Sequence, residues 1–252
     1  FFEKTEEDNS YLFKDKKIWQ DEEYRAMQGQ YPVIYLTFKD INSSNYQKSY
    51  SHIKKIIADE YFRHKYLLSF IEGENRRKVY QEIIDRKADI VDYEDSLSKL
   101  SEYLFQYYNK KPIFLIDEYD TPIIAAYNNG YYDEFIEFFK GLLSAGLKDN
   151  MYLEKSVVTG ITRVAKESIF SGLNNLKIST VLSKFYNDKF GLTKEEVLEV
   201  VEHYGLEYEE EEIIEWYNGY NFGGEEVYNP FSIINLVDNQ GQIKEYWINS
   251  SG

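Results

Sequence analysis

The chain has 252 residues, a formal net charge of −15 and no cysteine, which excludes disulfides, thiolate metal sites and a cysteine nucleophile. The negative charge argues against broad electrostatic binding of nucleic acid or acidic membranes. No apolar run approaches the roughly 18 residues of a membrane-spanning helix, and a cytoplasmic location is expected. The 25 tyrosines and 16 phenylalanines predict an unusually aromatic core.

The first part of the chain predicts one strand followed by long helices. Residues 3–30 are polar and are expected to form a helix end and a connecting loop. Residues 32–38 (PVIYLTF) are β-branched and aromatic and predict a strand. Apolar residues then recur at helical spacing over 45–70 and 75–109, with a break expected near Asp92.

The next part alternates strands and helices. The unbroken apolar run at residues 113–116 leads into acids and predicts a buried strand of a parallel sheet. A helix is expected over 131–148, a third strand over 156–161 and a weaker fourth strand over 176–182. This alternation predicts βαβ units and an α/β fold with a mostly parallel sheet.

The composition changes at Gly191 to charged, helix-forming sequence with a capping signal at Thr193. We therefore divide the chain into an α/β core (1–190) and a small helical, lid-like subdomain (191–252). The aromatic segment 216–224 has two interpretations: a stacking platform for a base, or a tight turn clamped by aromatic packing, which is favoured. The histidines show no metal-ligand spacing and are interpreted as structural or solvent-facing: His52, His64 and His203.

Three acids follow the predicted strand 113–116, at the sheet end where open α/β folds bind ligands. Many nucleotide triphosphatases end a strand in adjacent acids that hold magnesium and handle the attacking water. On this hypothesis Asp117 is the magnesium-side carboxylate, acting through a coordinated water. Glu118 then polarises the attacking water, and Asp120 supports either role. Alternatively, the acids only cap the strand and solvate a loop, and the strand alone does not decide.

A second candidate, TGITR at 159–163, lies at the end of the third predicted strand. Its hydroxyls, Thr159 and Thr162, are candidate phosphate contacts, and so is Arg163, whose planar guanidinium suits oxyanions. The alternative is a surface turn whose arginine pairs with one of the many acids. Taken by itself, this segment favours the surface turn.

Several segments in one order resemble the AAA-ATPase-like family of bacterial and archaeal proteins: PIFLIDEYDTPI (112–123), TGITR (159–163), FGLT (190–193), WYNGYNFG (216–223) and YNPFSIINLV (228–237). Members of that family often carry a restriction-endonuclease-like nuclease domain at the C-terminus. The resemblance implies a P-loop NTPase-like fold, with a mostly parallel sheet and helices on both faces. It also implies ATP and Mg²⁺ as cofactors, Asp117 and Glu118 as the Walker B acids, and a sensor region at 159–163.

The chain departs from the family pattern at its beginning. No G-x-x-x-x-G-K-[ST] phosphate loop is present, and in the family this loop precedes the region where the chain begins. Residues 1–2 are expected to be the tail of the helix after that loop. The strand leading into the loop is expected to be absent too, so strand 156–161 would lose one neighbour and expose unpaired backbone groups. We expect a fragment that binds nucleotide weakly or not at all.

The leading hypothesis is a fragment of an ATP-binding, ATP-hydrolysing protein that carries the Walker B and sensor regions and is inactive by itself. Its expected ligand is a nucleotide, with protein partners or self-association as further expectations. The alternative is a non-catalytic module that changes partners with nucleotide occupancy. Direct nucleic-acid processing is disfavoured by the charge and by the lack of a second acidic strand with a lysine.

Overall fold

The computed structural model describes residues 1–161, 176–206 and 210–249. The chain divides into two compact units, Phe1–Asn174 and Asn175–Gly252. This division falls ahead of the 190/191 boundary expected from composition. Segment 176–190 is tied to the second unit, where the Gly223 N–H donates to the Val181 carbonyl at 2.8 Å.

The first unit is built on a parallel three-stranded sheet in the order β1-β2-β3: β1 (Val33–Thr37), β2 (Ile113–Asp117) and β3 (Lys155–Val158). The register places Thr37 opposite Asp117 at the carboxyl ends of β1 and β2. The α/β class, the parallel sheet and the three main strand predictions are therefore confirmed.

Five helices of the first unit connect these strands: α3 (Tyr46–Arg63), α4 (Glu74–Ile84), α5 (Ile90–Tyr108), α6 (Thr121–Asn128) and α7 (Tyr132–Leu147). The Asn45 side chain caps α3 by accepting the Lys48 N–H. The predicted break lies between α4 and α5, where Arg86 has a φ of 60°. The short helix α6 was not predicted, although Pro122 in its first turn is a typical helix-start signal.

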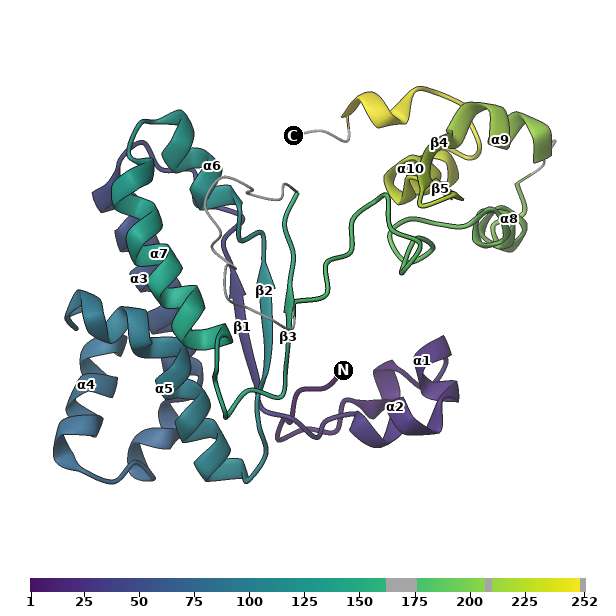
Figure 1. Cartoon of the computed structure of the whole chain (residues 1–252). Helices are drawn as coiled ribbons and strands as arrows, with labels where there is room; N and C mark the ends of the chain where they lie inside the picture. Colours follow the sequence, from purple (N-terminus) through teal and green to yellow (C-terminus); the bar gives the residue numbers. More distant parts are fainter. Residues whose placement is uncertain (162–175, 207–209, 250–252) are drawn as a thin grey trace. The chain divides into compact units, whose positions relative to one another are not determined.

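The long helices α3, α5 and α7 cover one face of the sheet (Figure 1). The core on this face is strongly aromatic, as the composition predicts, and its fully buried rings include Tyr61, Tyr93, Phe114, Phe135 and Phe139. Gly146 of α7 permits close packing, because a Cβ there would lie 2.9 Å from the Leu97 Cβ. Packing on this face therefore fixes the sheet against the helical layer.

The opposite face of the sheet is covered only in part by the described residues. Near the amino end of this face, Phe2 packs against the strands, and so does Met27, the last residue of α2 (Glu22–Met27). Farther along, Tyr35 is 48% exposed and Val157 is 49% exposed. In the described part of the first unit, the three long helices therefore lie together on one face, and the short helix α2 packs against the other face near its amino end.

The N-terminal segment is extended and pairs with the residues that immediately precede β1. The Tyr31 N–H donates to the Phe2 carbonyl at 2.9 Å, and the Lys4 N–H donates to the Tyr31 carbonyl at 2.8 Å. The expectation that residues 1–2 end a helix is therefore wrong, because backbone hydrogen bonds hold them in an extended conformation. Short helices follow before β1: η1 (Ser10–Leu12), α1 (Lys17–Gln20) and α2.

The second unit combines helices with a β-hairpin: α8 (Lys194–His203), α9 (Glu210–Tyr217), β4 (Asn218–Phe222), β5 (Glu225–Tyr228), α10 (Pro230–Asp238) and η3 (Tyr246–Asn249). The predicted cap at Thr193 is present as a reciprocal capping box with Glu196. The β-hairpin therefore stands beside the helices that were expected for this part of the chain. Gly223 and Gly224 form its turn with φ values of 54° and 98°, so segment 216–224 contains the expected tight turn within a strand pair.

The predicted fourth strand is wrong, because residues 176–182 form no strand in the structure. Their apolar side chains do not enter a sheet, and Val181 and Leu182 are exposed.

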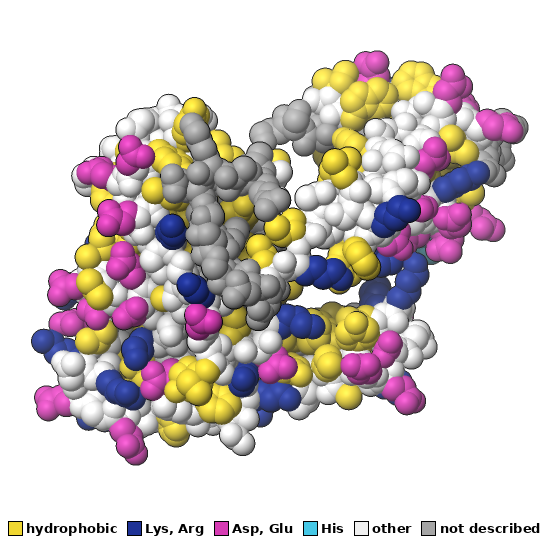
Figure 2. All heavy atoms as spheres, in the orientation of Figure 1, with side chains coloured by type: hydrophobic (Ala, Val, Ile, Leu, Met, Phe, Trp, Pro, Cys, Tyr) yellow, Lys and Arg dark blue, Asp and Glu magenta, His cyan; other side chains and the backbone are white. Residues whose placement is uncertain are grey.

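On the face shown in Figure 2, acidic, basic and hydrophobic side chains are interspersed over each unit. Among the described residues, no helix is both long and apolar enough to cross a bilayer.

Candidate functional site

The candidate site lies at the carboxyl end of the parallel sheet, on the face that the long helices leave uncovered. Asp117 is the last residue of β2, and Thr37 ends β1 directly opposite it. Thr159 follows β3, and its N–H donates to the Ile116 carbonyl at 2.8 Å. Because side chains alternate between faces, Thr37 and Asp117 project from the same face as Tyr35 and Val157.

Two threonine hydroxyls bind the Asp117 carboxylate, one on each oxygen. The Thr37 hydroxyl donates to Oδ2 at 3.1 Å, and the Thr159 hydroxyl donates to Oδ1 at 2.7 Å. The Glu118 N–H donates to the Thr159 Oγ1 at 3.4 Å, which favours the hydroxyl orientation that points at Asp117. The structure thus brings together Asp117 and Thr159, both predicted from the sequence, and adds Thr37, which was missed.

Glu118 stands at a sharp turn between β2 and α6. Its φ of 51° is left-handed, a conformation that costs a residue other than glycine roughly 1–2 kcal/mol. Its Oε2 accepts the Thr121 hydroxyl at 3.1 Å, and the Tyr119 N–H donates to the Thr159 carbonyl at 3.0 Å. The turn therefore holds the Glu118 carboxylate at the start of α6, beside the end of β2.

Asp120 is 1% exposed and lies against the chain that follows β3. A Cβ on Gly160 would lie 2.6 Å from the Asp120 Oδ1 and 2.7 Å from the Tyr119 Cε1. Only glycine allows the chain after β3 to approach Asp120 and Tyr119 so closely. Gly160 is therefore a further residue of the site, and the sequence pattern did not single it out. The supporting role expected for Asp120 stays a prediction.

Thr162 and Arg163, the other predicted phosphate contacts, lie outside the described residues. Among the residues that are described, no group of three or more His, Asp or Glu side chains could hold a metal ion. Mg²⁺ is commonly bound by only one or two carboxylates while it keeps several waters and contacts phosphates. The all-oxygen set of Asp117, Thr37 and Thr159 fits that chemistry.

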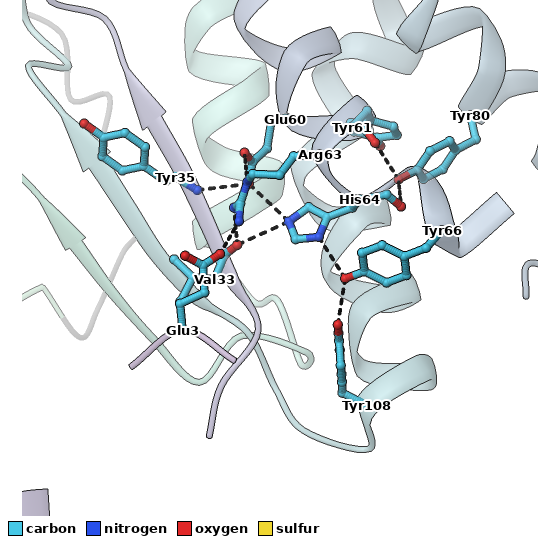
Figure 3. Close-up of polar contacts among 10 residues, drawn as sticks. All are labelled: Glu3, Val33, Tyr35, Glu60, Tyr61, Arg63, His64, Tyr66, Tyr80 and Tyr108. Carbon is cyan, nitrogen blue, oxygen red and sulfur yellow. Dashed lines mark hydrogen bonds and ion pairs between the residues drawn. The ribbon is translucent and has the colours of Figure 1, made fainter. Parts of the chain in front are cut away.

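A second polar cluster lies at the outer edge of β1 and involves two neighbouring side chains of α3 (Figure 3). The Tyr35 N–H donates to the Glu60 Oε1 at 3.0 Å. Arg63 donates to the Val33 carbonyl and to the Glu60 Oε1, both at 2.6 Å. These contacts satisfy edge groups of β1 that would otherwise need a strand partner.

Burial and the contacts with His64 and Arg63 shift the pKa of Glu60 in opposite directions. Burial raises the pKa of the Glu60 carboxyl, but hydrogen bonds from His64 and Arg63 outweigh it and leave the pKa below its usual value. The Nδ1 atom of the buried His64 ring lies 2.9 Å from the Tyr66 hydroxyl oxygen. That oxygen also accepts a hydrogen bond from the Tyr108 hydroxyl at 3.0 Å. This fits the structural role expected for His64, whereas no sequence pattern indicated Glu60 or Arg63.

A family profile described as predicted AAA-ATPase (AAA-ATPase-like) matches residues 1–170, which lie within the first unit. The chain belongs to this family. The resemblance to the AAA-ATPase-like family is thereby confirmed, and two of the five segments that carry it, 112–123 and 159–163, lie within the matched residues.

One curated relative of this AAA-ATPase-like chain is the "Uncharacterized protein in vnfD 5′ region" of Azotobacter chroococcum mcd 1, which is 34% identical over 141 residues. The alignment covers 55% of the chain but 27% of the relative, so the chain spans only about a quarter of that protein's length. No solved structure matches the chain.

Proposed function

We propose that this chain supplies the magnesium-side and sensor-side part of a site that binds and hydrolyses ATP. The observation that carries the proposal is the row of Thr37, Asp117 and Thr159 at the carboxyl end of a parallel sheet. Asp117 would hold Mg²⁺ through a coordinated water. A bound ion would supply positive charge to offset the negative charge that develops on the phosphates.

Glu118 is the residue that orients and polarises the attacking water in this proposal. Its carboxylate follows Asp117 directly, and the Thr121 hydroxyl anchors one of its oxygens at 3.1 Å. Thr159 serves as the sensor-strand hydroxyl. Thr162 and Arg163 are assigned to the phosphates from their place in the sequence alone.

The phosphate loop is the missing part of the site, and the open edge of β3 supports a place for it. In the described part of the chain, β3 pairs with β2 and has no second strand neighbour. We propose that a strand leading into a G-x-x-x-x-G-K-[ST] loop pairs there in a longer protein. Its backbone N–H groups would supply an anion cradle, since the 252-residue sequence contains no G-x-x-x-x-G-K-[ST] motif.

Calorimetric titration of the 252-residue chain with Mg-ATP tests the need for that loop. We expect no micromolar binding, because the sequence contains no G-x-x-x-x-G-K-[ST] phosphate loop. A micromolar dissociation constant would overturn the claim that the loop is required.

Turnover by a longer form that contains a phosphate loop tests the two acids. We expect Asp117→Asn and Glu118→Gln each to lower ATP turnover by about 100-fold or more. Glu154→Gln is the matched control, because Glu154 is exposed at the amino end of β3 and should leave turnover unchanged. Full turnover in Glu118→Gln would remove that residue from catalysis. Nucleotide binding without turnover in the unmodified longer form would favour the switch-like alternative.

A further inference from the structure

We propose that Thr37 is a positioning residue that fixes the Asp117 carboxylate for Mg²⁺ binding. The proposal rests on the metal role of Asp117 and extends it to a second strand. Its basis is the 3.1 Å hydrogen bond from the Thr37 hydroxyl to Oδ2, which mirrors the Thr159 contact on Oδ1.

The backbone places the Thr37 hydroxyl within reach of the carboxylate. Thr37 and Asp117 are register partners, and the next backbone contact, from the Phe38 N–H to the Asp117 carbonyl, is 3.0 Å long. Neighbouring strands lie about 4.8 Å apart, a spacing that a hydroxyl and a carboxylate on the same face can span. A β-branched threonine also has few side-chain rotamers, so its hydroxyl is held in place.

One hydroxyl would not orient the carboxylate fully. The terminal torsion of aspartate is broad, so a single donor on Oδ1 leaves the carboxylate plane free to rotate. Donors on both oxygens fix that plane. An ionised carboxylate offers about four acceptor positions, and two hydroxyls leave the others for the water ligands of a cation.

The probe is Mn²⁺, a paramagnetic substitute for Mg²⁺, added to the 252-residue chain with labelled threonine methyl groups. Binding at Asp117 should broaden the Thr159 methyl resonance in a saturable way, and the titration yields a dissociation constant. The variants Thr37→Val and Thr37→Ser remove and keep the hydroxyl, and Thr37→Ala is a second hydroxyl-free variant in case valine perturbs folding. The matched control is Thr5→Val, because Thr5 is exposed and donates locally to the Glu7 carbonyl.

We expect the hydroxyl-free variants to weaken Mn²⁺ binding by about tenfold, a size typical of residues that orient a metal ligand. Thr37→Ser and Thr5→Val should stay close to the unmodified chain. Unchanged affinity in Thr37→Val, or equal losses in Thr37→Ser and Thr37→Val, would overturn the positioning role alone. No saturable broadening of Thr159 in the unmodified chain would overturn both this role and the metal role of Asp117.

Discussion

The two edges of the sheet in the first unit differ in how their outward backbone groups are bound. At the outer edge of β1, Glu60 and Arg63 of α3 bind the Tyr35 N–H and the Val33 carbonyl. At the outer edge of β3, the described residues provide no strand partner. The β1 edge is thus sealed by side chains, whereas among the described residues the β3 edge, on the side of Thr159, has no strand partner. We propose that the strand leading into the phosphate loop pairs there.

The sealed edge shows how a charged pair can replace a strand. A carboxylate accepts the outward N–H and a guanidinium donates to the outward carbonyl, so both kinds of backbone group are satisfied. Glu60 is 6% exposed, and an unpaired charge at that depth would be costly. Arg63 and His64 offset this cost by binding the same carboxylate.

The strongest test of the sealed edge is Glu60→Leu, which keeps the volume and removes the acceptor. We expect the free energy of unfolding to fall by about 3 kcal/mol, because the Tyr35 N–H and the Arg63 guanidinium lose a buried partner. Urea denaturation measures the loss. Asp59→Leu is the matched control on the same helix, since Asp59 is 63% exposed and should change stability by no more than about 0.5 kcal/mol. Equal losses in both variants would contradict the sealing role.

The carboxyl end of the open edge is tested by Gly160→Ala. The added Cβ meets the buried Asp120 carboxylate and the Tyr119 ring, so we expect a loss of about 2 kcal/mol in urea denaturation. Gly141→Ala in α7 is the comparison, because its Cβ meets the flexible Glu94 side chain and alanine favours helix. Opposite signs are therefore expected for the two variants. A neutral Gly160→Ala would mean that the turn at Asp120 can move freely.

The smallest expected effect is the pH dependence of the sealed edge, measured as the stability difference between the unmodified chain and Glu60→Gln. Near neutral pH we expect the unmodified chain to be more stable by about 1 kcal/mol, because the ionised carboxylate makes the stronger hydrogen bonds.

The sign of this dependence follows from the direction of the pKa shift. The pKa of Glu60 in the folded chain lies below the ordinary value of 4.5, so its contribution is complete above 4.5 and is lost as the pH falls through the folded pKa. The difference should therefore shrink below about pH 4.5. A difference that stays constant to lower pH would show that the charge of Glu60 does not contribute. Asp59→Asn should show no comparable trend.

Local pattern predicted most of the first unit correctly. The apolar run before Asp117, the β-branched segment before Phe38 and the helical spacings each depend on residues close together in the sequence, so they can be identified from periodicity. The same reasoning failed for 176–182, where an apolar composition resembled a strand but no neighbouring strand pairs with it. It also missed the hairpin of β4 and β5 behind the aromatic segment at 216–224.

The amino-acid sequence by itself determined that acids end a buried strand and that Thr159 lies near the end of the next one, because strand ends are local features. Only the tertiary structure decided that Thr37 reaches Asp117, since that contact depends on the register of two strands 80 residues apart. The same holds for Glu60, which seals β1 only because α3 packs beside that strand. Register and packing are long-range choices, and no spacing within one segment encodes them.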